Sequence, residues 1–371
     1  MSPRFVRRPA ALIAVLALAA GVAAAAPAAH ASITPACVWQ SLYLLNGWQS
    51  AQTSWNTGDP EYCVDNGIVY LSGSLKNPTN AGHEFAVLPP QALPTSRLDL
   101  LAYTYDGTIG QLIIGPDGAM YADGSDADQY TSLAGVSFPV AGTALTPLPL
   151  YPGWHSGQAQ FGAGNPGYVI TDGIVHWTGS LTTTNTPNTG YPGNYFAMVP
   201  GAAHADRCLN ATVYTYGDHV GNMAIWPPST VFSDRDMFVS DTPGGTTSYY
   251  ASFTSLAGIS YPADGTATWQ PLTLQGGWAE VTPSSYCQYY PSTPSYYVQG
   301  HVAYLIGWIQ QNQAGSEFVG TLPAIARPVH DLYMIVGPDG YLHISPNGNM
   351  YVFGETEGWV RLDTIVYQTS S

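Results

Sequence analysis

The chain contains one strand-like pattern three times. The copies read VYLSGSL at 69–75, VHWTGSL at 175–181 and AYLIGWI at 303–309. Other landmarks recur in the same order around each copy, beginning with the Gly-Trp pairs that end at Trp48, Trp154 and Trp278. These tryptophans are 106 and 124 residues apart, which fits whole domains and is far above the ~20 to 50 residues of a solenoid repeat. Each copy is therefore long enough to bury its own core.

We expect three domains, at residues 32–140, 141–264 and 265–371. The segments between them, PVAGTALTPLP and PADGTATWQPL, are rich in Pro, Gly and Thr, which is typical of loops. The sequence leaves open whether the three units close into a ring or follow one another like beads.

Residues 1–31 carry the three parts of an export signal. Arginines form a positive end, an Ala- and Leu-rich run follows, and the AHA at 29–31 fits a small-x-small cleavage pattern. The alternative is a membrane anchor, but an apolar run that leads at once to a cleavage pattern favours removal of the segment. We therefore expect a secreted protein with no membrane span, whose mature chain begins at Ser32.

The composition favours strands and turns. Only 9% of the residues are charged, whereas Gly, Pro and Tyr are abundant. A helical protein needs Glu, Lys and Arg on its wet faces, so this composition predicts an all-β fold. The net charge of −15 excludes nucleic acid and anionic membranes as favourable partners.

Within each copy, apolar and polar residues alternate with a period of two, and turns such as Pro116-Asp117-Gly118 and Pro346-Asn347-Gly348 separate the runs. Asp-Gly and Asn-Gly tolerate the positive φ of tight hairpins. We expect about seven or eight strands per copy, closed as an antiparallel β-sandwich or a jelly-roll-like barrel.

A glycine lies on the core face of each repeated strand. These glycines are Gly73, Gly179 and Gly307. A strand glycine implies a bulge or a bulky neighbour across it, and we expect Trp48, Trp154 and Trp278 to cover the three sites as part of the core. The alternative is that these tryptophans are exposed and stack on sugar. The opposite face turns apolar in the third copy, so we expect that copy to bury it.

Four cysteines in an exported chain without zinc-type spacing predict disulfides. Three pairings are possible. We favour Cys37 with Cys63, inside one repeat, and Cys208 with Cys287, between the second repeat and the third.

The order of the landmarks resembles the small β-rich tip domain at the C-terminal ends of phage tail fibres and tail-associated proteins, especially of actinobacterial phages. The first copy carries it as LLNGW at 44–48, GIVYLSG at 67–73, Leu-Pro, an Asp-Gly hairpin and SLAGVSF at 132–138. The resemblance covers nearly all of 42–367, three times over.

Such tips commonly form trimers and many bind bacterial surface glycans, so the resemblance implies a monomeric chain whose copies surround a pseudo-threefold axis. The chain departs from the pattern in two places. The second copy has WPPS after Ile225 in place of the hairpin, and the third has Thr364 where the others have Gly135 and Gly258. An export signal does not suit a phage particle component, which favours a cellular relative.

A glycan-degrading hydrolase is the competing class. The dense acids are Asp59 with Glu61, the run Asp123, Asp126 and Asp128, and the pair Asp234 and Asp236. A glycosidase needs two facing carboxyls, one of them kept protonated, whereas these acids lie in Gly-flanked loops without counterparts in the other copies. We expect solvated acids and no catalytic site, with calcium at Asp123, Asp126 and Asp128 as an alternative.

Tyrosines in Pro- and Ser-rich stretches are the candidate ligand-binding residues. They are Tyr249, Tyr250, Tyr286, Tyr289, Tyr290, Tyr296 and Tyr297. Exposed rings suit sugars or peptides, although tyrosines in a Lys-poor chain can simply cover apolar surface. The sequence thus predicts a secreted, non-enzymatic protein that recognises a glycan or another surface polymer, with a structural or partner-binding module as the alternative.

Overall fold

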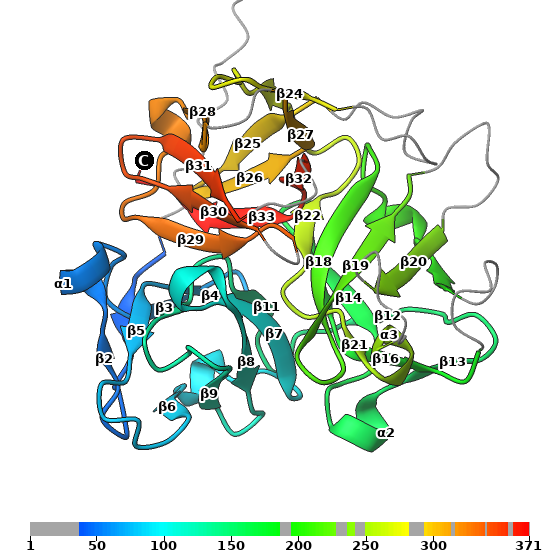
Figure 1. Ribbon diagram of the computed structural model, residues 1–371. Helices are drawn as coiled ribbons and strands as arrows, with labels where there is room; N and C mark the ends of the chain where they lie inside the picture. Colours follow the sequence, from blue (N-terminus) through cyan, green and yellow to red (C-terminus); the bar gives the residue numbers. More distant parts are fainter. Residues whose placement is uncertain are drawn as a thin grey trace, which may run out of the picture. The chain divides into compact units, whose positions relative to one another are not determined.

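Short antiparallel strands form nearly all the regular structure in the computed structural model (Figure 1). The structure describes residues 37–185, 194–227, 236–241, 249–281, 293–312, 316–337, 340–354 and 359–370. Among these residues the α-helices are single turns, α1 (Gln52–Trp55), α2 (Gln158–Phe161) and α3 (Tyr249–Ser252). The predicted all-β class is confirmed. No helix in the described ranges has the length and apolar character that crossing a membrane requires.

The first repeat contains three antiparallel sheets. In hydrogen-bonded order the strands of the first sheet are β1 (Gln40–Ser41), β3 (Glu61–Asp65), β4 (Ile68–Ser72) and β11 (Ser137–Pro139). Those of the second are β10 (Thr131–Ser132), β5 (Ser74–Lys76) and β2 (Gln49–Ser50). Those of the third are β6 (Glu84–Val87), β9 (Ala119–Asp123), β8 (Ile109–Ile114) and β7 (Leu98–Tyr103).

The second repeat has the same first sheet and one larger sheet. The first sheet consists of β12 (Thr146–Pro147), β14 (Gly167–Thr171), β15 (Ile174–Thr178) and β22 (Ser260–Pro262). The larger sheet consists of β13 (Trp154–Ser156), β16 (Ser180–Thr183), β21 (Thr254–Ser255), β18 (Leu209–Thr215), β19 (His219–Ile225), β20 (Asp236–Asp241) and β17 (Tyr195–Met198). It merges the two sheets that are separate in the first repeat, because β18 pairs with β21.

The third repeat returns to three sheets. The first consists of β23 (Gln270–Pro271), β25 (Ser295–Gln299), β26 (Val302–Ile306) and β33 (Ile365–Gln368). The second consists of β24 (Trp278–Glu280), β27 (Trp308–Gln311) and β32 (Trp359–Arg361). The third consists of β28 (Phe318–Thr321), β31 (Asn349–Phe353), β30 (Tyr341–Ile344) and β29 (Leu332–Ile335). Strand order in the first sheet is thus the same in all three repeats.

Each repeat also has an apolar core of its own. One buried cluster runs from Leu42 to Phe138, a second from Leu148 to Tyr261 and a third from Leu272 to Tyr367. Trp48, Trp154 and Trp278 are buried in these clusters, as expected for core residues. The domain boundaries themselves stay a prediction, because residues 36–371 form one compact unit.

The repeated glycine turns the chain from one sheet into another. Gly73 lies between β4 and β5, which belong to different sheets, and has φ +86°. A side chain there would overlap the carbonyl of Asp59, and Gly179 meets the carbonyl of Asn165 in the same way. The backbone, and not the expected tryptophan ring, is therefore what approaches each of these two glycines most closely. Sheet-switching bends of this kind are where a positive φ is needed.

The outer face of the third repeated strand is buried, as expected. Tyr304 of β26 packs against Ile174 of the second repeat and Val366. Ile306, two residues further along, joins the apolar core of the second repeat. The third copy therefore buries this face against its neighbour.

The predicted disulfide inside the first repeat is present. Cys37 and Cys63 are joined, with a Cα–Cα distance of 5.8 Å. The bridge fastens the start of the described chain to β3. Cys208 is also disulfide-bonded, and Cys287, its predicted partner, lies outside the described residues.

Candidate functional site

The first two predicted tyrosines differ in exposure. Tyr249 is half-buried and stacks on His219, with 3.5 Å between the ring centroids. Tyr250 is fully buried, and its hydroxyl donates to Asn194 Oδ1 at 3.0 Å. The expectation of an exposed ring therefore fails for Tyr250, because its position in the short helix α3 turns it into the core of the second repeat.

The other predicted tyrosines that the structure describes lie on β25 in the third repeat. Tyr296 packs against the core of that repeat, and Tyr297 contacts the rings of Trp269 and Tyr304. Tyr286, Tyr289 and Tyr290 lie outside the described residues. The ligand-binding role of this set stays a prediction.

The three carboxylates considered as an alternative calcium site are not grouped together in the described part of the chain. Asp123 accepts a hydrogen bond from the amide of Gly124 at 2.8 Å and lies 3.4 Å from His83 Nδ1. Asp126 accepts hydrogen bonds from neighbours in its own turn. Across the described ranges, no three His, Cys, Asp or Glu side chains are grouped to hold a metal ion. The described residues therefore do not form the calcium site that was the alternative for Asp123, Asp126 and Asp128.

Of the other predicted acids, the structure describes Asp59, Glu61 and Asp236. Asp59 and Glu61 lie two residues apart on one extended segment, and burial, followed by the charge of Asp59, raises the pKa of Glu61. Asp236 is buried and accepts a hydrogen bond from the Tyr151 hydroxyl at 2.5 Å, while Asp234 lies outside the described residues. A glycosidase uses two carboxyls that flank the scissile bond, and among the described residues Asp59 and Glu61 come from the same segment.

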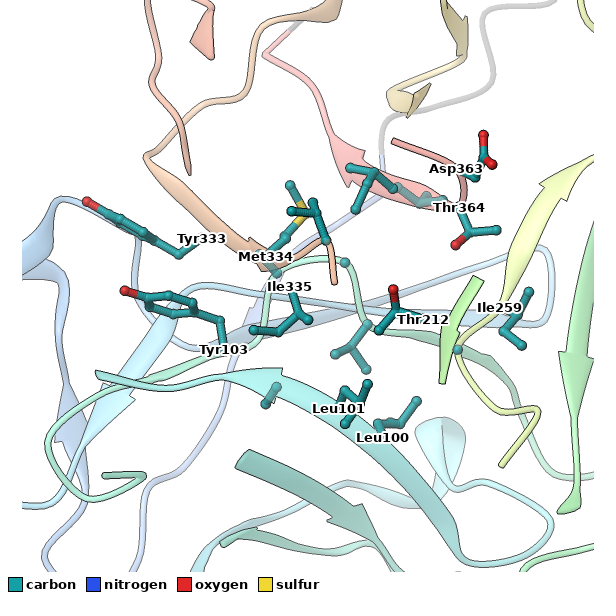
Figure 2. A pocket seen from close by; sticks show the side chains of 18 of the residues that line it. Leu100, Leu101, Tyr103, Thr212, Ile259, Tyr333, Met334, Ile335, Asp363 and Thr364 are labelled. Atoms are coloured by element: carbon teal, nitrogen blue, oxygen red, sulfur yellow. The ribbon is translucent and has the colours of Figure 1, made fainter. Parts of the chain in front are cut away.

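A cavity of about 110 Å³ lies where the three repeats meet (Figure 2). The same turn of each repeat lines it, at residues 134–136, 257–259 and 363–365. Tyr103 and Tyr333 lie at one end of the cavity and Asp363 at the other (Figure 2). Because ligand pockets usually measure about 300–1,000 Å³, this cavity is too small for a glycan and marks a structural junction.

Equivalent turns contact equivalent strands at this junction. A side chain at Gly258 of the second repeat would meet Leu100 of the first, and one at Gly135 of the first would meet Met334 of the third. Leu100 and Met334 are the third residues of the equivalent strands β7 and β29. The third turn has Thr364, which adopts the same left-handed conformation at φ 63°.

Asp363 links the third repeat to the second at the edge of this cavity. Its carboxylate accepts hydrogen bonds from the Gly307 amide at 2.7 Å, Trp308 Nε1 at 2.9 Å and the Asn210 amide at 3.0 Å. The equivalent residues are Ala134 and Ala257. Burial outweighs the three donors and raises the pKa of Asp363 to about 6.

We therefore expect Asp363 to make folding less favourable as the pH rises from about 4 to about 6. Its pKa is higher in the folded than in the unfolded chain, so the folded state binds the proton more tightly. The stability present below pH 4 falls by about 3 kcal/mol by pH 7. Urea unfolding at pH 4, 5, 6 and 7 measures this, with Asp363→Asn as the reference. Parallel profiles for the two proteins would contradict the assignment.

The outward face of the sheet formed by β28, β31, β30 and β29 carries a row of aromatic rings. Core and outward residues alternate along these strands, and the outward rings are half-buried. We call this set the aromatic face, and it consists of Tyr333, Tyr341, His343, Tyr351 and Phe353. Centroids of Tyr333 and His343 are 4.5 Å apart with an interplanar angle of 2°, and those of Tyr341 and Phe353 are 5.0 Å apart. Tyr351 joins the two pairs, since its ring centroid lies 5.6 Å from that of His343 and 6.3 Å from that of Phe353.

The rings continue into the first repeat. Trp55 contacts Tyr333 at 6.3 Å between centroids and Tyr105 at 5.8 Å. Tyr103 is buried beneath them and contacts Tyr341 at 4.8 Å. The aromatic surface therefore crosses from the third repeat to the first without interruption.

Hydroxyl, amide and carboxylate groups lie around the aromatic face. Asp331 accepts a hydrogen bond from His343 Nε2 at 2.7 Å and another from the Asn56 side chain at 2.6 Å. Burial raises the pKa of Tyr333 to about 12. Its phenol is a neutral hydrogen-bonding group at physiological pH, as it would be at the ordinary tyrosine pKa. Rings combined with neutral hydroxyl and amide groups suit an uncharged, polyhydroxylated ligand better than an anionic one.

Sequence reasoning missed the aromatic face, although a signal for it was present. In YLHI at 341–344 and MYVF at 350–353, aromatic residues alternate with buried aliphatic ones. In the equivalent strands of the first repeat the outward positions are mostly aliphatic or polar, as in IGQLII at 109–114. The aromatic face can be found in the sequence by comparing the outward strand positions of the three copies. Counting tyrosines in loops does not find it.

Comparison of the chain with models of protein families, with curated protein sequences and with solved structures found no match.

Proposed function

We propose that this chain is a secreted, non-enzymatic recognition protein that binds a neutral glycan or similar surface polymer on the aromatic face. The observation that carries the proposal is the continuous row of half-buried rings from Phe353 on β31 to Trp55 in the first repeat. Sugar rings stack on such surfaces and use the hydroxyl groups at their edges. The net charge of −15 disfavours anionic polymers.

We also propose that the repeats are compact sandwich-like domains arranged around a pseudo-threefold axis through the central cavity, as in a tail-fibre tip. The matching contacts of Gly135 with Met334 and of Gly258 with Leu100 support this arrangement. A second pair of matching contacts supports it too. The amide of Arg97 donates to the carbonyl of Gly162, and the amide of Asp331 donates to that of Asn56.

Tyr351→Ala is expected to weaken glycan binding about tenfold, because a stacked ring contributes on the order of 1 kcal/mol beyond its buried area. The measurement is retention of the purified protein on insoluble neutral polysaccharides and on a glycan array. Tyr121→Ala is the matched control, since Tyr121 occupies the equivalent place on β9 and makes no ring contact among the described residues.

Equal losses in the two variants would show that the aromatic face is not the binding surface. Absence of binding by the unaltered protein across wall and neutral polysaccharides would favour the alternative, a structural or partner-binding module. Product release from any polysaccharide would support the hydrolase instead.

A further inference from the structure

Away from the central cavity, each pair of neighbouring repeats meets at a junction, and two equivalent sequence positions lie at each of these three junctions. Each repeat has a 3₁₀ turn that ends in a buried alanine, at Pro90–Ala92, Gly201–Ala203 and Ala324–Ala326. The first position of interest is four residues after that alanine, and it is occupied by Ser96, Arg207 and His330. The other position immediately precedes the first strand of each repeat and is occupied by Trp39, Leu145 and Trp269. A loop of one repeat thus faces the first strand of the next.

At the junction between the second repeat and the third, the residues at these two positions, Arg207 and Trp269, contact each other. The guanidinium of Arg207 lies over the ring of Trp269, 5.0 Å from its centroid. A cation over an indole face is a favourable electrostatic contact. In this junction the chain supplies its own cation.

The junction between the third repeat and the first has the indole without the arginine. Trp39 lines a cleft of about 130 Å³ together with Glu61 and His330. The His330 side chain instead lies against Gly58, where an added side chain would come within 2.7 Å of its ring. Among the described residues Trp39 has no ring or cation partner.

Glu61 places a carboxylate beside this indole. Ser41 pairs with Glu61 and Gln40 with Tyr62 across β1 and β3, so Trp39 and Glu61 project from the same face of the sheet. The Cys37–Cys63 disulfide fixes the segment that carries Trp39. An indole and a carboxylate on one face of a small cleft form a site for an organic cation.

We propose that the cleft lined by Trp39, Glu61 and His330 binds a guanidinium group, with primary ammonium groups as weaker ligands. Its volume suits a head group and not a whole sugar chain. The junction between the first repeat and the second has Leu145 and Gly167 at the positions of Trp39 and Glu61, so it is not a cation site. This site does not depend on the proposed glycan-binding function.

The test is an NMR titration of the full chain with methylguanidinium, followed on the tryptophan indole N–H signals and on the backbone amide signals, which report binding also where Trp39 is replaced. Methylguanidinium is expected to shift the Trp39 signal, and urea, its neutral analogue, is not. Trp39→Leu, which copies Leu145, and Glu61→Gln are each expected to weaken binding about fivefold or more. Tyr351→Ala is the control that leaves this binding unchanged.

Arg207→Ala tests the equivalence of the junctions. Ser295 occupies the Glu61 position here, but Asp206 lies 3.3 Å from Arg207 Nε and supplies the carboxylate, so removing the chain's own guanidinium is expected to let methylguanidinium bind at Trp269 as well. Arms with n-butylammonium and glucosamine distinguish a preference for a guanidinium, a simple amine or an amino sugar. Equal shifts with urea, binding that survives both Trp39→Leu and Glu61→Gln, or no second site in Arg207→Ala would overturn the proposal.

Discussion

Replacing Asp363 with alanine is expected to lower the free energy of unfolding by about 3–5 kcal/mol, because it removes the acceptor of three hydrogen bonds in a buried site. The alanine itself fits, since Ala134 and Ala257 occupy the equivalent turns. The loss arises because the carboxylate accepts three N–H groups, and each buried donor left without an acceptor costs about 1–3 kcal/mol. Water that enters the adjacent cavity of about 110 Å³ can accept hydrogen bonds from the freed N–H groups, which offsets part of this loss of stability.

Equilibrium urea unfolding at pH 5, followed by tryptophan fluorescence, measures this effect. The control is Asp264→Ala, because Asp264 is exposed and its carboxylate has no hydrogen bond within the described residues. If the two variants lose equal stability, the carboxylate of Asp363 does not hold the second and third repeats together. If Asp363→Ala does not fold, Asn210→Pro removes one of the donors and provides a second test.

The repeat pattern was enough to predict strands and the buried side of the repeated one, but not their number. Seven or eight strands per copy were expected, whereas the described residues of each copy form eleven, several of them only two residues long. Alternation along 69–75 places Val69, Leu71 and Leu75 inward, and all three are buried. The period of two is a local property of a strand, so it can be read from one segment. The same reasoning identified the buried tryptophans, because each recurs at the same place in its copy.

Contacts between repeats could not be predicted in the same way. Asp363 is 153 residues from its partner Asn210, and nothing in either segment indicates the other. The contact of Tyr333 in the third repeat with Trp55 in the first also joins segments that are far apart in the sequence, so neither segment indicates it. Loop tyrosines looked more accessible in the sequence, but burial depends on how a short helix such as α3 packs, and Tyr250 turned inward. A site between two copies can be predicted only when the arrangement of the copies in space is known.

The strand corner at Gly73 allows the steric and conformational costs of a side chain to be separated. Gly73 and Gly142 have nearly the same positive φ, +86° and +88°. An added Cβ at Gly73 would overlap the Asp59 carbonyl, whereas none of the surrounding atoms lies within 4 Å at Gly142. Strain from the left-handed backbone is therefore common to both sites, and the overlap is specific to Gly73.

Gly142→Ala is expected to cost about 1–2 kcal/mol, the strain of a left-handed residue alone. Gly73→Ala adds the displacement of the Asp59–Pro60 backbone, and overpacking of a buried site costs a further 1–3 kcal/mol or so. We therefore expect a total near 3–4 kcal/mol for Gly73→Ala, and the same for Gly179→Ala, whose neighbour is the Asn165 carbonyl. Urea unfolding of the three variants measures the difference. Equal losses at Gly73 and Gly142 would mean that the close backbone approach does not require a glycine, and that the strand could turn between sheets with any residue that tolerates a positive φ.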